Sequence, residues 1–159
     1  MTGKKILYID LDNTLVDFAT GIAAISDDLR REFAGHLDDV PGTFALMSPM
    51  PAALDAYARL AEVYDTYILS TAPWDNPSAW QHKLEWVHEH IGSIAGTPAY
   101  KRLILSHYKH LNRGDYLIDD RPNNGASEFE GEWVKFSTDD YTDWPAVTDY
   151  LLAEQKGTK

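Results

Sequence analysis

The stretch YIDLDNTLVDF, from Tyr8 to Phe18, decides the fold, because a short apolar run ends there in two closely spaced aspartates. Such a run is typical of a strand that is buried on both faces. Asp10 and Asp12 come where this strand ends, and two carboxylates so close together repel each other unless a cation neutralises them. We therefore expect a cation-binding site at the carboxyl end of the first strand.

The rest of the chain alternates short apolar runs with helical patterns, which is typical of βαβ units and a buried parallel sheet. Further strands are expected up to Ser70, over Leu103–Leu105, up to Asp119 and around Trp133–Phe136. The pattern predicts an α/β fold.

Helices are expected between these strands, with proline or serine near their starts. Pro51 and Pro145 suit the first turn of a helix, and Ser78 suits an N-cap. The helix after Ser78 would carry an apolar stripe of Trp80, Leu84, Val87 and Ile91. The segment 19–49 departs from the alternation: it predicts one amphipathic helix, about Ile22 to Phe33, and then an irregular stretch, and we interpret it as an insertion after the first strand.

Composition limits the classes of function. The 159 residues include 14 Lys+Arg and 25 Asp+Glu, a net charge of -11, which argues against binding to duplex nucleic acid. There is no cysteine, so disulfides and thiolate metal sites are excluded. The apolar runs are far shorter than the roughly 20 residues of a membrane span, and the start lacks the apolar stretch of a signal peptide. We expect a single cytoplasmic domain, residues 1–159, whose exposed aromatic residues would permit self-association.

The polar residues at the strand ends predict a functional site. Asp10, Ser70 and Asp119 each end an apolar strand, and in an open parallel sheet ligands bind beyond those carboxyl ends. If the first and fourth strands are neighbours, Asp12 and Asp120 join the same small volume. Hard oxygen ligands without thiols favour Mg²⁺, with Asp10, Asp12 and Asp119 as the expected ligands.

The same residues suit phosphate chemistry. Ser70 and Thr71 offer hydroxyl and backbone donors to phosphoryl oxygens, and a lysine in the crevice would balance the charge on a transferring phosphoryl group. Asp10 would attack phosphorus and form an aspartyl phosphate. Asp12 would protonate the leaving alkoxide and later deprotonate water, with a pKa raised by the neighbouring acids.

These residues, in this order, resemble the motifs of the haloacid dehalogenase (HAD) superfamily of phosphohydrolases. DLDNTLVDF is similar to its first motif, YILST to the second and LIDDRP to the fourth. The resemblance implies that Asp10 is the nucleophile, Asp12 the acid/base, Ser70 the phosphate-binding hydroxyl and Asp119 a metal ligand supported by Asp120. It also implies a Rossmann-like three-layer α/β/α fold with strand order 3-2-1-4-5 and a helical cap after strand 1.

Within the superfamily the chain most resembles the 5′(3′)-deoxyribonucleotidases, through Phe18 after LVD, the tetrapeptide STAP and the run DDRPNNGA. That resemblance places Lys109 at the motif-three lysine, which would bind phosphate and act in catalysis. Lys101 and Arg102 are the rivals, but they lie before the third strand, on the wrong side for the crevice. The cap, residues 19–49, is shorter than in that family and leaves Phe18, Phe33, Phe44 and Trp74 as pocket candidates.

The function expected is that of a Mg²⁺-dependent phosphomonoesterase acting on (deoxy)nucleoside monophosphates. Two alternatives stay open: a HAD phosphatase for another small phosphomonoester, such as a sugar phosphate, and a module that binds a nucleotide or metal without catalysis. Individual roles also stay open. Arg121 pairs with Asp119 or Asp120 or lies exposed, Asp17 supports the site or caps a helix, and Phe18 is a substrate wall or part of the core.

Overall fold

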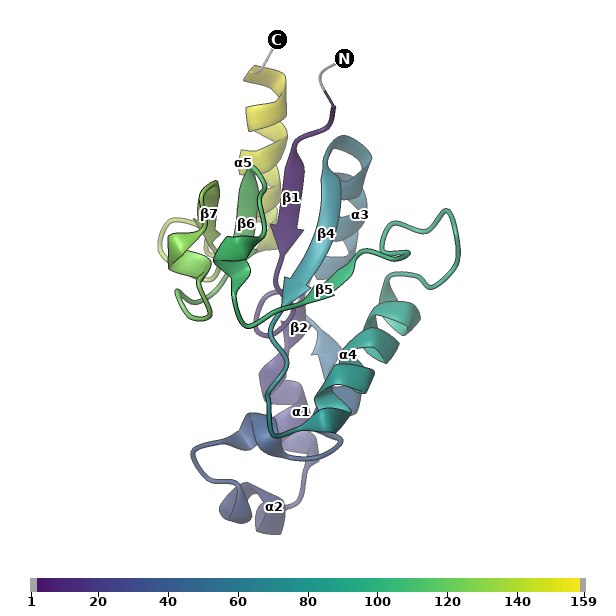
Figure 1. Ribbon diagram of the computed structural model, residues 1–159, viewed down its shortest axis with the longest axis vertical. Helices are drawn as coiled ribbons and strands as arrows, with labels where there is room; N and C mark the ends of the chain where they lie inside the picture. Colours follow the sequence, from purple (N-terminus) through teal and green to yellow (C-terminus); the bar gives the residue numbers. More distant parts are fainter. Residues whose placement is uncertain (1–2, 158–159) are drawn as a thin grey trace.

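The computed structural model describes residues 3–157, and its central element is a five-stranded parallel sheet. The strands are β1 (Ile6–Ile9), β4 (Asp65–Ser70), β5 (Leu103–Leu105), β6 (Tyr116–Asp119) and β7 (Glu132–Lys135). Their order in space is β5-β4-β1-β6-β7 (Figure 1). This is the 3-2-1-4-5 order expected from the sequence, so the predicted fold class is confirmed.

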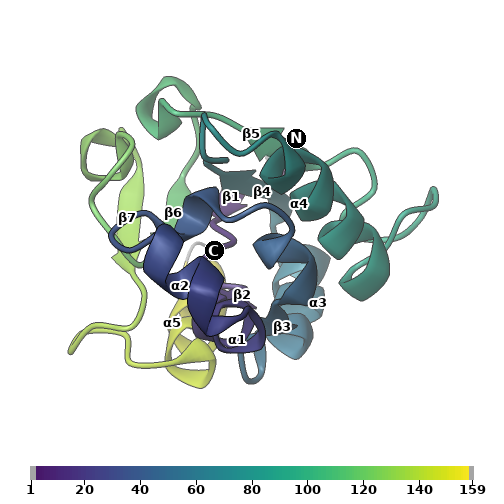
Figure 2. The same ribbon diagram turned by 90° about the horizontal axis from the view of Figure 1, so that it is seen from below.

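The larger hydrophobic core lies on one face of the sheet, beneath α3 (Ala53–Val63) and α5 (Trp144–Gly157). Figure 2, which looks along the strands, shows both helices on the same side. Leu7 and Ile9 of β1 alternate into this core because successive strand residues point to opposite faces. The helix α4 (Pro77–His90) contributes Trp86 to the same core.

The opposite face carries a smaller core built on Tyr8, Leu69 and Leu117. The segment between β6 and β7 covers it with Ala126 of the 3-10 turn η4 (Ala126–Glu128) and with Phe129. The sheet thus lies between two covering layers, and the second is the thinner one.

Two proline-based predictions of helix starts differ in outcome. Pro145 is the second residue of α5, in the first turn as expected. Pro51 instead lies two residues before the start of α3, because Ala52 takes a left-handed conformation with φ 63° and the helix begins at Ala53. Within residues 3–157, no helix combines the length and apolar character that a membrane crossing needs.

Two short antiparallel strands, β2 (Val16–Asp17) and β3 (Ser48–Pro49), pair where an inserted segment leaves the main fold and returns to it. We call residues 18–47 the insert. It contains the helices α1 (Phe18–Ala24) and α2 (Asp27–Glu32) and the 3-10 turns η1 (Leu37–Asp39) and η2 (Thr43–Leu46). Figure 1 shows the insert beyond the carboxyl ends of the central strands, where the sequence predicted the functional site.

The prediction of one helix over Ile22–Phe33 is wrong. Extended backbone at Ile25 ends α1, and α2 starts afresh after Ser26. The Ser26 hydroxyl accepts a hydrogen bond from the backbone N–H of Leu29 at 3.3 Å, which is a serine N-cap. The cap therefore overrides the apolar periodicity and splits the segment into two short helices.

The predicted cap of α4 is also wrong. The helix begins at Pro77 after Asn76, so Ser78 lies within its first turn. The Ser78 hydroxyl donates to Asn76 Oδ1 at 2.6 Å and accepts from the backbone N–H of Gly42 at 3.0 Å. Ser78 thus ties α4 to the insert instead of satisfying an N–H of its own helix.

Further hydrogen bonds fasten the insert to α4. The Asn76 side-chain amide donates to the backbone carbonyls of Asp38, at 2.9 Å, and Val40, at 3.1 Å. The Trp86 indole N–H donates to the carbonyl of Met47 at 3.0 Å. Both ends of α4 therefore contribute to holding the insert against the core.

Candidate active site

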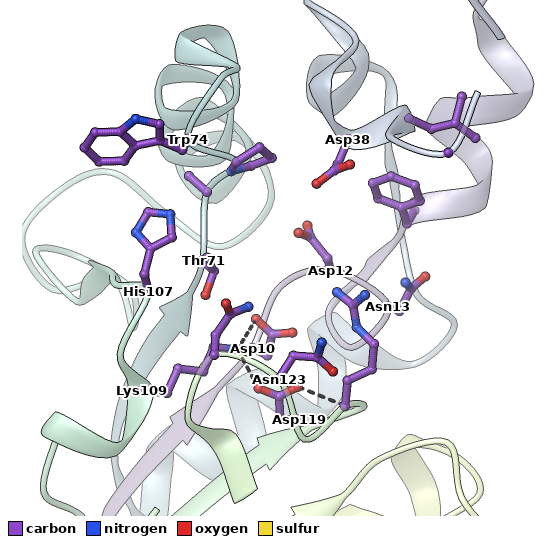
Figure 3. A pocket seen from close by; sticks show the side chains of 17 residues that line it. Asp10, Asp12, Asn13, Asp38, Thr71, Trp74, His107, Lys109, Asp119 and Asn123 are labelled. Carbon is purple, nitrogen blue, oxygen red and sulfur yellow. Dashed lines mark hydrogen bonds and ion pairs between the residues drawn. The ribbon is translucent and has the colours of Figure 1, made fainter. Parts of the chain in front are cut away.

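A cavity of about 570 Å³ opens between the carboxyl ends of the central strands and the insert. Its walls come from segments far apart in the sequence, and Figure 3 shows their side chains converging on it. The lining includes Asp10, Asp12, Phe18, Asp38, Thr71, Trp74, His107, Lys109, Asp119, Arg121 and Asn123. The fold thus brings most of the predicted site residues to one place.

Strand register brings Asp10 and Asp119 together. β1 and β6 pair in parallel with Ile9 opposite Ile118, so the residues that follow each position lie side by side. The backbone N–H of Asp10 donates to the carbonyl of Ile118 at 2.9 Å. Both aspartates are buried, at 4% and 2% exposure, so their charges need a partner inside the protein.

Lys109 is that partner. It lies in the 3-10 turn η3 (Lys109–Leu111), and its Nζ is 2.9 Å from Asp10 Oδ1 and 2.5 Å from Asp119 Oδ2. Burial alone would lower the pKa of Lys109, but the two carboxylates reverse that effect and raise it. The lysine is therefore held as a cation between the two acids.

Asp10, Asp119 and Asp120 form a group of carboxylates suited to a metal ion, with one oxygen from each within 4.8 Å of the others. Burial, reinforced by Asp10, raises the pKa of Asp119 to about 7 and that of Asp120 to about 6. Asp120 Oδ1 is buried and has no hydrogen-bond partner among the described residues. Crowded acids with an unused hard oxygen fit a divalent cation such as Mg²⁺.

Asp12 lies apart from this group and has a different partner. Its Oδ2 accepts a hydrogen bond from Nζ of Lys83 at 2.7 Å. Its Oδ1 is buried without a hydrogen-bond partner among residues 3–157. Burial raises the pKa of Asp12, and Lys83 opposes that rise. The carboxylate group of the structure thus contains Asp120, and the expectation of Asp12 as a metal ligand stays a prediction.

Ser70 and Thr71 take different positions at the end of β4. Ser70 is fully buried, and its hydroxyl accepts from Lys83 Nζ at 3.0 Å. Thr71 lines the cavity, and its hydroxyl donates to the carbonyl of Ser106 at 2.8 Å. Thr71 is therefore the more accessible of the two to a ligand.

The arginine and aspartate whose roles were left open now have defined contacts. The backbone N–H of Arg121 donates to Asp119 Oδ1 at 3.1 Å, while its side chain is more than half exposed, with Nε 3.7 Å from Asp120 Oδ2. Arg121 is thus both paired and accessible to a ligand. The Asp17 side chain accepts from the backbone N–H of Ala19 at 3.2 Å, so Asp17 caps α1.

Two aromatic side chains, Phe18 and Trp74, line the cavity. Phe18 lines it and packs edge-on against Phe44, with ring centroids 5.9 Å apart. Trp74 is 77% exposed, and its ring lies 5.8 Å from that of His107. Phe44 is buried, and Phe33 stacks near His36 away from the lining.

The rival cations lie elsewhere. Arg102 pairs with Asp65 at 2.5 Å, and Nζ of Lys101 lies over the ring of Tyr100. Neither residue lines the cavity that contains Lys109.

Lys83 is the site residue that sequence reasoning missed. It lies in the helix for which the sequence predicted an apolar stripe through Leu84, which is 44% exposed in the structure. The buried residues of that helix are instead Ala79, Lys83, Trp86 and Val87. A lysine on the buried stripe of a helix needs an internal partner, so the helical spacing of Lys83 was an indirect signal of its role.

Sequence comparisons agree with the geometry of the cavity. The family described as 5′ nucleotidase, deoxy (pyrimidine), cytosolic type C protein matches residues 30–142. A protein of Vibrio phage KVP40 is 52% identical over 98% of this chain and 89% of its own length, and its name places it among the 5′(3′)-deoxyribonucleotidases. A Staphylococcus aureus protein of the same name is 31% identical over 70% of this chain and 64% of its own length.

Solved structures share the fold at low sequence identity. A haloacid dehalogenase-like hydrolase from Xanthomonas campestris superposes with a TM-score of 0.56 at 12% identity, over 98% of this chain and 100% of that one. A haloacid dehalogenase-like family protein from Streptococcus pneumoniae gives 0.53 at 16% identity, over 97% and 99%. These similarities concern the fold alone.

Proposed function

Because the chain belongs to the 5′(3′)-deoxyribonucleotidase family, on a haloacid dehalogenase-like fold, we propose that it hydrolyses small phosphoric monoesters, with (deoxy)nucleoside monophosphates as its preferred substrates. One observation carries the proposal: Lys109 Nζ contacts both Asp10 and Asp119 at the carboxyl ends of the central strands. A nucleophile, a cation and a metal-type carboxylate within one cavity are what phosphoryl transfer requires.

Asp10, Asp119 and Asp120 would hold a Mg²⁺ ion, since their oxygens converge and Asp120 Oδ1 has no other partner among the described residues. When bound, the ion would offset the charge of these acids and of the phosphoryl group. The sequence-based expectation of Asp12 as a third ligand stays a prediction, and its side chain pairs with Lys83.

In the first step, a carboxylate oxygen of Asp10 forms a bond to phosphorus while the ester P–O bond breaks, which gives an aspartyl phosphate. Lys109, held beside Asp10, stabilises the negative charge of the phosphoryl oxygens. Arg121, which lines the same cavity, is placed to donate hydrogen bonds to those oxygens, and Thr71 would contribute its backbone N–H because its hydroxyl donates to the carbonyl of Ser106.

Asp12 serves the proton transfers. It gives a proton to the departing alkoxide in the first step and takes one from water in the second, when water attacks phosphorus and Asp10 is released as a carboxylate. Asp12 lines the cavity, and its raised pKa favours the protonated form that the first transfer needs.

The size and walls of the cavity support a nucleotide substrate. A volume of about 570 Å³ is in the range of small-ligand sites. Phe18 and the exposed Trp74 offer ring faces on which a base would stack. The net charge of -11 favours a small substrate over duplex nucleic acid, as expected of an enzyme acting on free nucleotides in the cytoplasm.

The test is phosphate release from a panel of deoxyribonucleotides, ribonucleotides and ribose phosphate, each measured with Mg²⁺ and with a chelator. We expect Mg²⁺-dependent turnover that is fastest on nucleotides. Faster turnover of the sugar phosphate would overturn the substrate assignment. Failure to release phosphate from any monoester, with nucleotides still bound, would overturn the enzymatic one.

A further inference from the structure

Lys83 is a buried lysine at the centre of α4 that the mechanism above does not use. Its exposure is 2%, and its side chain is 1% exposed. A lysine is rarely buried to this degree unless its ammonium group is paired and hydrogen-bonded, because the loss of water is costly. The partners of Lys83 therefore define its role.

Those partners belong to three separate parts of the site. Lys83 Nζ donates to Asp12 Oδ2 at 2.7 Å and to Ser70 Oγ at 3.0 Å, and it lies 4.5 Å from the ring centre of Phe44. Asp12 follows β1, Ser70 ends β4, and Phe44 belongs to the insert. The ammonium group of Lys83 thus links Asp12, the end of β4 at Ser70 and the ring of Phe44, which packs against Phe18.

The contact with Asp12 is one-sided. Lys83 engages Oδ2, while Oδ1 stays buried without a hydrogen-bond partner in the described part of the chain, on a residue that lines the cavity. The hydrogen bond from Lys83 therefore fixes the carboxyl group of Asp12 in one orientation at the wall of the cavity.

The two buried lysines pair with different aspartates of the DLD motif. Lys109 contacts Asp10 and Asp119 on the β6 side, and Lys83 contacts Asp12 from α4. Removing Lys109 would disturb the nucleophile and the metal-type acids. Removing Lys83 would disturb Asp12 and Ser70 and leave the contacts of Lys109 in place.

Resting on the function proposed above, we propose that Lys83 is a positioning residue for proton transfer, which holds the carboxyl group of Asp12 in the orientation needed at the leaving oxygen and then at the attacking water. Lys83 touches neither the substrate nor the phosphorus.

The experiment compares the first-turnover rates of Lys83→Met and wild type on two substrates. The substitution keeps the length of the side chain and removes its charge. p-Nitrophenyl phosphate has a leaving group that needs no proton, whereas a deoxyribonucleoside monophosphate has one that does. We expect the first-turnover rate on the nucleotide to fall about 100-fold or more, because that is the scale of general acid catalysis. The first-turnover burst of nitrophenolate should survive, followed by slow steady-state release because water activation is also impaired.

Two outcomes would overturn the proposal: an equal loss in the first turnover on both substrates, or no loss on either. Lys101→Met, an exposed lysine away from the cavity, is the matched control and should behave as wild type. Wild-type protein that hydrolyses neither ester would instead refute the proposed function, so the two failures are distinguishable.

A double variant keeps the proposal testable if Lys83→Met folds poorly with Asp12 left unpaired. In Asp12→Asn with Lys83→Met both charges are absent. If Lys83 acts through Asp12, the double variant is no slower on the nucleotide than Asp12→Asn alone. A further loss of tenfold or more in the double variant, at equal folded fraction by circular dichroism, would show that Lys83 acts by another route and would overturn the proposal.

Discussion

Replacement of Lys109 by methionine tests the charge balance at the centre of the site. The substitution removes the cation whose Nζ lies 2.9 Å from Asp10 Oδ1 and 2.5 Å from Asp119 Oδ2, and nearly preserves the volume of the side chain. Two buried acids then face each other with no positive partner. The structure therefore predicts loss of both stability and turnover.

The magnitude follows from the spacing of the acids. One oxygen of each acid lies within 4.8 Å of the others, and at that limit two unit charges repel by about 3.5 kcal/mol at an effective dielectric constant of about 20. Removing one side of a buried ion pair typically costs about 3–5 kcal/mol. For a chain of this size, the unfolding midpoint of metal-free protein at pH 8 should fall by roughly 10 °C.

The pH dependence has a definite sign. The pKa of Asp119 is raised to about 7, so its ionisation opposes folding increasingly as the pH rises from about 4 to 7. The loss in Lys109→Met should therefore be largest above pH 7 and smaller near pH 5.5, where Asp119 holds a proton. Added Mg²⁺ should recover part of the loss at pH 8, because it binds only the folded site.

The assay is thermal unfolding of wild type and Lys109→Met at pH 5.5 and 8, with Mg²⁺ and with chelator, alongside phosphate release. Lys101→Met is again the control. We expect turnover of Lys109→Met to fall about 100- to 1000-fold, the scale for loss of one preorganised charge-stabilising group. Equal stability of Lys109→Met and wild type at pH 8 without metal would refute the charge-balance reasoning.

Further expected outcomes concern the nucleophile, the metal ligands, the pocket wall and the insert. Asp10→Asn should lower turnover at least about a thousandfold with little change in the unfolding midpoint, and full activity in a sample free of deamidation would contradict its role. Mg²⁺ binding measured by calorimetry in two buffers should release more protons at pH 6.5 than at pH 8.5, since the pKa values of Asp119 and Asp120 are raised to about 7 and about 6. Equal proton release at the two pH values would count against Asp119 and Asp120 as ligands. Trp74→Ala should raise KM for nucleotides about tenfold and leave KM for ribose phosphate unchanged, whereas a parallel rise for both would exclude base stacking. Gly21→Ala should lower the free energy of unfolding by about 1–3 kcal/mol, because a Cβ there would lie 2.6 Å from the side chain of Met47. If denaturant titration finds no loss, the insert can shift to make room for the added methyl group.

The fold was predictable because its signals are local and mutually consistent. Each apolar run ends in a polar residue, and parallel strands necessarily bring their carboxyl ends to one edge. That rule predicted the meeting of Asp10 and Asp119, which the pairing of Ile9 with Ile118 now explains. Lys109 needed the family resemblance as well, since a lysine in a loop carries no positional signal of its own.

The insert and the second lysine were not predictable by the same rules. A 3.6-residue periodicity ran through Ser26, and the competing N-cap hydrogen bond that splits the helix depends on backbone geometry. Ser78 was misassigned because its partner, the N–H of Gly42, is distant in sequence. Lys83 pairs with Asp12 across 71 positions of the chain, and such long-range polar contacts leave only an indirect trace in the sequence.

The hydrogen bonds from α4 to the backbone of the insert bear on how substrates enter the cavity and how products leave it. Asn76, Ser78 and Trp86 hold the backbone of the insert against α4. We therefore expect the entrance of the cavity to keep a nearly constant width, so that the size of a substrate limits its access and release of the product needs no large rearrangement of the chain.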